Sequence, residues 1–171
     1  MPVALILGHS FVRRLQRDLL NHFDPRADLS FNLEGTAAVN LHRVGGRTVS
    51  KIRDLDLPAV ERMAPDVVIL EIGTNDLTDK GPEVVGSAID DLVRLLVGSY
   101  AIRVVCVCHV IPRGISHAKA EEFAKKVAIL AQYLDDVLAD IPNAFCWRHR
   151  SFTHPQRDFY LDDCVHLNPA V

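Results

Sequence analysis

Asp66–Ile72 reads DVVILEI and is followed at once by Gly73-Thr74-Asn75-Asp76. A continuous apolar run rich in β-branched residues is typical of a strand that is buried on both faces. Such strands belong to parallel sheets that helices cover on either side. This run therefore decides the fold class that the sequence predicts.

Outward from this strand, apolar runs alternate with helical patterns along the chain. The other predicted strands are Val3–Leu7, Ala38–Val44, Ile102–Val110 and Asn143–Trp147, and the predicted helices are Ser10–Phe23, Thr48–Leu57, Pro82–Val97 and Ser116–Leu138. This alternation predicts an α/β fold, a three-layer, doubly wound, flavodoxin-like sheet of five parallel strands in the order 2-1-3-4-5, with helices on both faces. With 171 residues, 49% of them hydrophobic, residues 1–171 are expected to form a single domain.

Composition and charge exclude several classes of protein. A net charge of −3 and a pI near 6.2 lack the basic footprint of a general nucleic-acid-binding domain. The apolar start Val3–Leu7 is too short for a transmembrane helix, and no signal peptide is visible. The four cysteines, Cys106, Cys108, Cys146 and Cys164, have no zinc-binding spacing and suggest no disulfide framework. Reduced cysteines fit a cytoplasmic location.

Three of the predicted strands end next to residues with useful chemistry. Ser10 follows the first strand, Gly46 the second and Asn75 the third. Ligands of doubly wound sheets bind beyond the carboxyl ends of the strands, at the point where the strand order reverses. We therefore expect these three loops to converge at one edge of the sheet.

Each segment has a structural and a chemical interpretation. Ser10 is either a helix N-cap or a nucleophile whose own N–H helps to hold an oxyanion. Gly45-Gly46 is either a tight turn or a close backbone approach that offers the Gly46 N–H. Asn75 either belongs to an Asx turn or donates its amide to a developing negative charge. Asp76 either holds the loop through backbone hydrogen bonds or caps the turn.

Asp163-Cys164-Val165-His166 completes the set near the carboxyl end. A short turn can place both the Asp163 and the His166 side chains on one side of the chain. The carboxylate would then orient the imidazole, and the imidazole would accept the proton of a serine. The alternative is a surface loop that carries one of the eight histidines by chance.

In this order the four segments resemble the conserved blocks of the SGNH (GDSL-type) hydrolases, and the resemblance spans nearly the whole chain. Gly8-His9-Ser10 stands at the nucleophile block, and Gly46, Gly73–Asp76 and Asp163–His166 stand at the later blocks. The resemblance implies acyl transfer through a covalent serine ester.

The resemblance implies a catalytic role for each matching residue of this chain. Ser10 is the nucleophile, His166 the base and Asp163 the partner of that base. The oxyanion hole consists of the Ser10 N–H, the Gly46 N–H and the Asn75 side chain. His9 stands where the family usually has aspartate, and we expect its side chain to point away from Ser10.

Three sequence segments are also similar to those of a narrower group of proteins: ILGHSFVRRL, DVVILEIGTNDL and DCVHLN. This group is the esterase domains in the first open-reading-frame proteins of some animal non-LTR retrotransposons. Those domains are intracellular, and lipid substrates have been suggested for them.

The sequence therefore predicts a serine esterase for small acyl esters, with lipid-derived esters among the candidates, and with neither metal nor cofactor. The alternative is a binding or scaffold domain that keeps the fold without turnover, for which His9 is the support. A flavodoxin-like nucleotide binder is disfavoured because the sequence has no G-x-G-x-x-G motif and no P-loop. The oligomeric state stays open.

Three further features are less decisive. Arg113 follows the fourth strand and is either a substrate-binding residue or a solvated loop arginine. The segment Trp147–Tyr160 mixes aromatic and basic residues, which suits an ordinary loop, a pocket wall, or peripheral contact with phospholipid headgroups or nucleic acid. Glu71 is an acid in an apolar strand and requires a partner that the sequence does not name.

Overall fold

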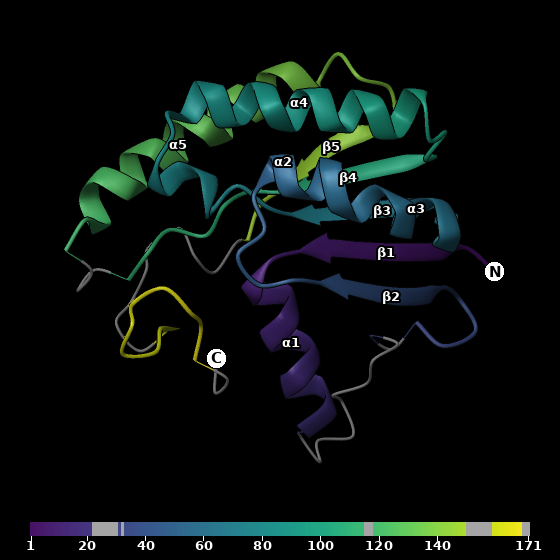
Figure 1. Ribbon diagram of the computed structural model, residues 1–171, viewed down its shortest axis with the longest axis horizontal. Coiled ribbons are helices and arrows are strands. Elements are labelled where there is room, and N and C mark those ends of the chain that lie inside the picture. The colour runs from purple at the N-terminus through teal and green to yellow at the C-terminus, as the bar shows by residue number, and fades with distance from the viewer. Residues whose placement is uncertain (22–30, 32, 115–117, 150–158, 169–171) are drawn as a thin grey trace.

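Five parallel strands form one sheet in the computed structural model, which describes residues 1–21, 31, 33–114, 118–149 and 159–168. The strands are β1 (Val3–Gly8), β2 (Ala38–Arg43), β3 (Val67–Glu71), β4 (Val104–Cys108) and β5 (Ala144–Trp147). Their order is β2-β1-β3-β4-β5, as Figure 1 shows. The predicted fold class and strand order are confirmed.

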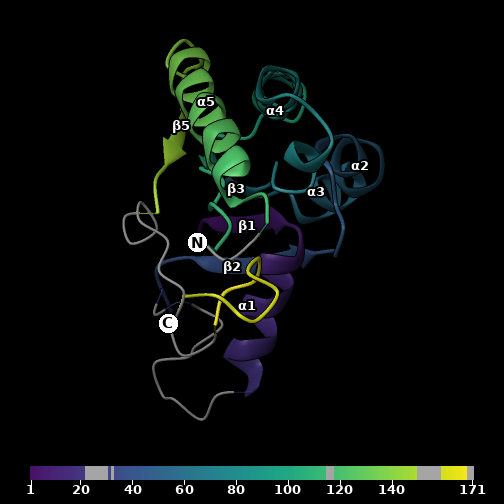
Figure 2. The same ribbon diagram turned by 90° about the vertical axis from the view of Figure 1, so that its left-hand side faces the viewer.

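The strand order determines where the helices lie. The helical segments are α1 (Ser10–Asn21), α2 (Val49–Lys51), η1 (Ile52–Asp56), α3 (Leu57–Met63), η2 (Asp76–Thr78), α4 (Pro82–Gly98) and α5 (Ala120–Leu138). The step from β1 to β2 runs in the opposite direction to every later step across the sheet. Because parallel crossovers are right-handed, α1 lies on one face and the later helices on the other (Figure 2).

Element boundaries differ from the predicted ones in a few places. The single helix predicted at Thr48–Leu57 is instead a run of α2, a π-helical turn and α3 that continues to Met63. Phe23 and Ser116, at the ends of two predicted helices, lie outside the described residues. In the part of the chain that the structure describes, no helix has the length and apolar character needed to span a bilayer.

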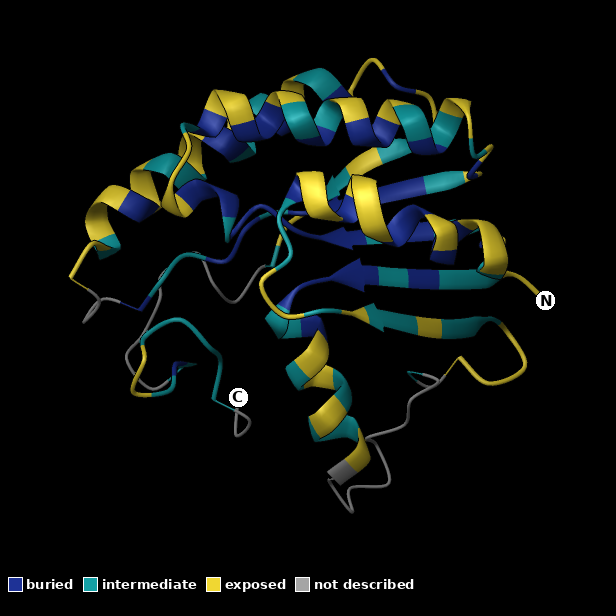
Figure 3. Ribbon diagram, viewed as in Figure 1, coloured by how far each residue is buried: buried dark blue, intermediate teal, exposed yellow. Residues whose placement is uncertain are grey.

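The hydrophobic core lies between the sheet and α2 to α5. Alternate residues of the three central strands point into it, and Figure 3 shows these strands as largely buried: Leu5, Leu7, Val68, Leu70, Val105 and Val107. The opposite face is less covered, since α1 is its only helix among the described residues. Phe145 and Trp147 on β5 are 47% and 55% exposed on that face.

Gly8 ends β1 where the chain turns into α1. A Cβ at this position would lie 2.5 Å from Val12 Cγ2 and 2.8 Å from the Glu71 carbonyl oxygen. Those distances are shorter than van der Waals contact, and one of the neighbours is backbone. The turn that presents Ser10 therefore depends on the absence of a side chain at Gly8.

We predict that Gly8→Ala destabilises the fold by about 1–3 kcal/mol, the usual cost of overpacking. Gly98→Ala is the matched control, because a Cβ at Gly98 would meet nothing within 4 Å. Urea unfolding followed by circular dichroism measures both free energies. Equal stability of the two variants would contradict the packing argument.

Candidate active site

Ser10, His166 and Asp163 meet at the carboxyl edge of the sheet. Ser10 begins α1 directly after β1, and its Oγ lies 3.1 Å from His166 Nε2. His166 Nδ1 lies 2.7 Å from Asp163 Oδ2. The arrangement suits a tautomer in which Nδ1–H donates to the carboxylate and Nε2 accepts from the serine hydroxyl.

Asp163 is held by its own turn. Its Oδ1 accepts the backbone N–H groups of Val165 and His166, both at 2.9 Å. Burial acts to raise the pKa of Asp163, but these N–H donors and the His166 ring outweigh it and lower the pKa to about 2. The carboxylate is therefore ionised at neutral pH and can stabilise a protonated His166.

The segment 159–168 that carries this pair is fastened to the loop after β4. The Tyr160 hydroxyl donates to the Pro112 carbonyl oxygen at 2.5 Å, and the Gly114 N–H donates to the Cys164 carbonyl oxygen at 2.7 Å. The Phe11 ring also meets the His166 ring edge-on, with centroids 5.9 Å apart. These contacts restrict the position of His166, and sequence patterns gave no indication of them.

His9 lies beside Ser10, so the expectation that it points away is wrong. Its Nδ1 is 3.4 Å from Ser10 Oγ and 3.5 Å from the Phe11 backbone nitrogen, both long contacts. His9 is 1% exposed, and burial lowers its pKa, against the opposing charge of Glu71. His9 is therefore neutral at neutral pH, and it lacks the aspartate that orients His166.

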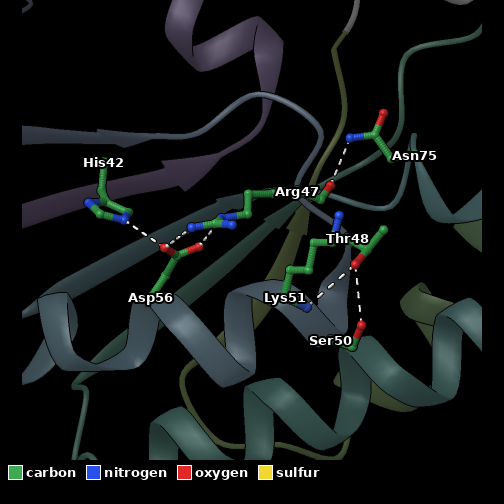
Figure 4. Close-up of polar contacts among 7 residues, drawn as sticks. All are labelled: His42, Arg47, Thr48, Ser50, Lys51, Asp56 and Asn75. Carbon is green, nitrogen blue, oxygen red and sulfur yellow. Dashed lines mark hydrogen bonds and ion pairs between the residues drawn. The ribbon is translucent and has the colours of Figure 1, made fainter.

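Gly46 lies in the exposed loop between β2 and α2 with a φ of +71°. This left-handed conformation favours glycine because it has no Cβ. The next residue, Arg47, anchors the loop. Its guanidinium donates to both carboxylate oxygens of the buried Asp56, at 2.8 and 3.0 Å, and His42 contacts the same carboxylate (Figure 4).

The Gly73–Asp76 loop also holds the Gly46 loop, through hydrogen bonds to the backbone that follows Gly46. Asn75 donates its side-chain N–H to the Arg47 carbonyl oxygen at 2.7 Å, as Figure 4 shows. Asp76 is buried and accepts the Val49 N–H at 3.0 Å, so its carboxylate holds backbone at the start of α2 and not only in its own loop. One N–H of the Asn75 amide is thus used within the protein, and the amide has a second to offer.

Arg113, in the loop after β4, contacts η2 and α5. Its guanidinium donates to Thr78 Oγ1 at 2.9 Å and stacks over the Phe123 ring at 4.3 Å from the centroid. Burial lowers its pKa. A substrate-binding role stays a prediction. Most of the predicted aromatic and basic loop, residues 150–158, lies outside the described residues.

Comparison with known proteins gives one family and many similar folds. The model of the GDSL-like lipase/acylhydrolase family matches residues 7–171. A search of curated proteins finds no match.

Among solved structures, a putative GDSL-like lipase from Parabacteroides merdae superposes with a TM-score of 0.70 at 16% identity, over 98% of this chain and 88% of the other. An acetylxylan esterase from Geobacillus stearothermophilus gives a TM-score of 0.72 at 12% identity, over 99% and 88%. A protein from Streptococcus pneumonia described as a putative platelet activating factor gives 0.71 at 14% identity, over 99% and 78%. At these identities the superpositions show a shared fold.

Proposed function

The chain belongs to the GDSL-like lipase/acylhydrolase family, and from that membership we propose that it is a serine esterase acting on small acyl esters, lipid-derived esters among them. The observation that carries the proposal is the continuous contact from Ser10 Oγ through the His166 ring to Asp163. A positioned base next to a hydroxyl, with a carboxylate behind the base, is the arrangement that activates a serine nucleophile.

In the first half of the proposed reaction, Ser10 Oγ attacks the ester carbonyl carbon while His166 Nε2 takes the hydroxyl proton. The carbonyl oxygen becomes an oxyanion, which would be stabilised by the Ser10 N–H, the Gly46 N–H and the second N–H of Asn75. Asp163 stabilises the imidazolium. When the tetrahedral intermediate collapses, the C–O bond to the alcohol breaks, and His166 gives the alcohol its proton.

In the second half, water attacks the acyl-serine. His166 takes one proton from the water and returns it to Ser10 Oγ as the acid leaves. The two protons of the water thus end on the acid and the serine, so the cycle needs no further reactant.

The alternative is an SGNH-fold binding domain without turnover, and His9 is the residue that favours it. A neutral, buried His9 leaves the Ser10–His166 contact in place, which supports the esterase. The resemblance to retrotransposon esterase domains, the cytoplasmic location and contact with a membrane surface stay predictions.

The first prediction separates the esterase from the binding domain. A fluorophosphonate probe should label the wild-type chain covalently, and Ser10→Ala should lose both labelling and hydrolysis of short-chain p-nitrophenyl esters. Circular dichroism on the same samples checks that the variant is folded. Labelling or full activity in folded Ser10→Ala would refute the proposed nucleophile.

The second prediction concerns the oxyanion hole. Asn75→Ala should lower kcat by about 10²–10³-fold with a smaller change in KM, the usual result of losing one positioned donor. Because Asn75 also holds Arg47, Asp56→Asn serves as the control, since it weakens the other anchor of Arg47 and leaves the amide intact. An equal loss of kcat in the two variants would assign Asn75 to loop positioning alone.

The third prediction distinguishes the two histidines. His166→Ala should lose about 10³-fold or more in kcat/KM, as removal of a triad base does, while His9→Ala should lose far less. Burial lowers the pKa of His9, so this residue is neutral at neutral pH and its removal changes no charge beside Ser10 there. We therefore expect kcat/KM of His9→Ala at neutral pH to stay close to the wild-type value. An inactive His9→Ala beside an active His166→Ala would reverse the assignment.

A further inference from the structure

A second group of reactive side chains lies behind the catalytic edge. Glu71, Cys108 and His149 each place one carboxylate oxygen, thiol sulfur or ring nitrogen within 4.8 Å of the other two. Glu71 ends β3, Cys108 ends β4, and His149 follows β5 by two residues. Three adjacent parallel strands thus bring together residues that are far apart in the sequence.

Glu71 contributes a buried carboxylate to this group. It is 8% exposed, and its Oε2 lies 3.3 Å from His149 Nε2. Its Oε1 is buried and has no hydrogen-bond partner in the part of the chain that the structure describes. A buried carboxylate oxygen without a partner costs free energy, and the contact of Oε2 with His149 leaves Oε1 unsatisfied.

The donor set fits one class of ligand. A thiolate, an imidazole and a carboxylate are the three ligands that zinc uses, at about 2.3 Å for sulfur and about 2.0–2.2 Å for nitrogen and oxygen. Tetrahedral geometry at those bond lengths puts neighbouring ligand atoms about 3.3–3.7 Å apart. The 3.3 Å between Glu71 Oε2 and His149 Nε2 already matches this spacing.

We propose that Glu71, Cys108 and His149 bind a divalent zinc-class ion, with water as the fourth ligand. The ion would neutralise the buried carboxylate and fix the ends of β3, β4 and β5 relative to one another. Binding forms a metal–sulfur bond and releases the thiol proton to solvent. The cysteine spacing gave no sign of this site, because only one of its three ligands is a cysteine.

A second group of possible metal ligands lies nearby, but its carboxylate is already paired with a cation. His109, Asp135 and Cys146 also lie within 4.8 Å of one another. There, however, Asp135 already pairs with both His109 and the Arg148 guanidinium. A fixed cation beside the carboxylate opposes a second one, so we assign the metal to the Glu71 group.

The test uses Co²⁺ as a spectroscopic substitute for zinc on the reduced, full chain. Titration should give one bound ion per chain and a thiolate-to-cobalt charge-transfer band. Cys108→Ser should lose that band and weaken zinc binding, measured by competition with a chromophoric chelator, by about 100-fold or more, because even outer-shell changes cost 10–100-fold. Cys106→Ser is the matched control, two residues earlier on the same strand face, and should keep both.

Three results would overturn the proposal: no charge-transfer band in the wild-type chain, an unchanged band in Cys108→Ser, or loss of the band in Cys146→Ser instead. Ser10→Ala should bind Co²⁺ as the wild type does. Metal binding is therefore measured independently of ester hydrolysis, so the metal-site proposal and the esterase proposal can be refuted separately.

Discussion

The arrangement of loops at the carboxyl edge of the sheet depends on the hydrogen bonds of one buried carboxylate, that of Asp76. It accepts the Val49 N–H at the start of α2 and pairs with Lys80 at 3.2 Å, while the adjacent Asn75 holds the Arg47 carbonyl. The loops after β2 and β3 thereby become one unit. Since β1 lies between those two strands, Ser10 enters the space that this unit defines. The position of Ser10 relative to the Gly46 and Asn75 loops therefore follows from the sheet order.

Much of the fold follows from sequence pattern alone. The run DVVILEI predicts a central parallel strand, and alternation with helices predicts the order that the structure has. The same order brings the loops of Ser10, Gly46 and Asn75 to one edge. The D-x-x-H spacing also suffices to foresee the contact of Asp163 with His166, because a three-residue turn has few geometries. These features can be predicted because they depend on local periodicity and on short spacings along the chain.

Other features depend on contacts between distant segments, and no local pattern encodes them. The ion pair of Arg47 with Asp56 and the bond from Tyr160 to Pro112 join segments that the sequence gives no reason to pair. His9 was expected to point away because it is adjacent to Ser10 on the chain, but it lies in the bend between β1 and α1, where its Nδ1 comes within 3.4 Å of Ser10 Oγ. The partner of Glu71 became visible only once β5 placed His149 beside it.

The contact between Ser10 and His166 joins positions that are 156 residues apart. A ribosome makes the chain from its amino end, so β5 and the whole sheet precede His166 in synthesis. Until His166 is synthesised, a nascent chain therefore has Ser10 and all five strands but lacks the imidazole that the proposed mechanism requires. A proteolytic cut between β5 and Asp163 would likewise separate the sheet and Ser10 from the proposed base. On the proposed mechanism, hydrolysis requires both partners of a contact that spans 156 residues of one chain.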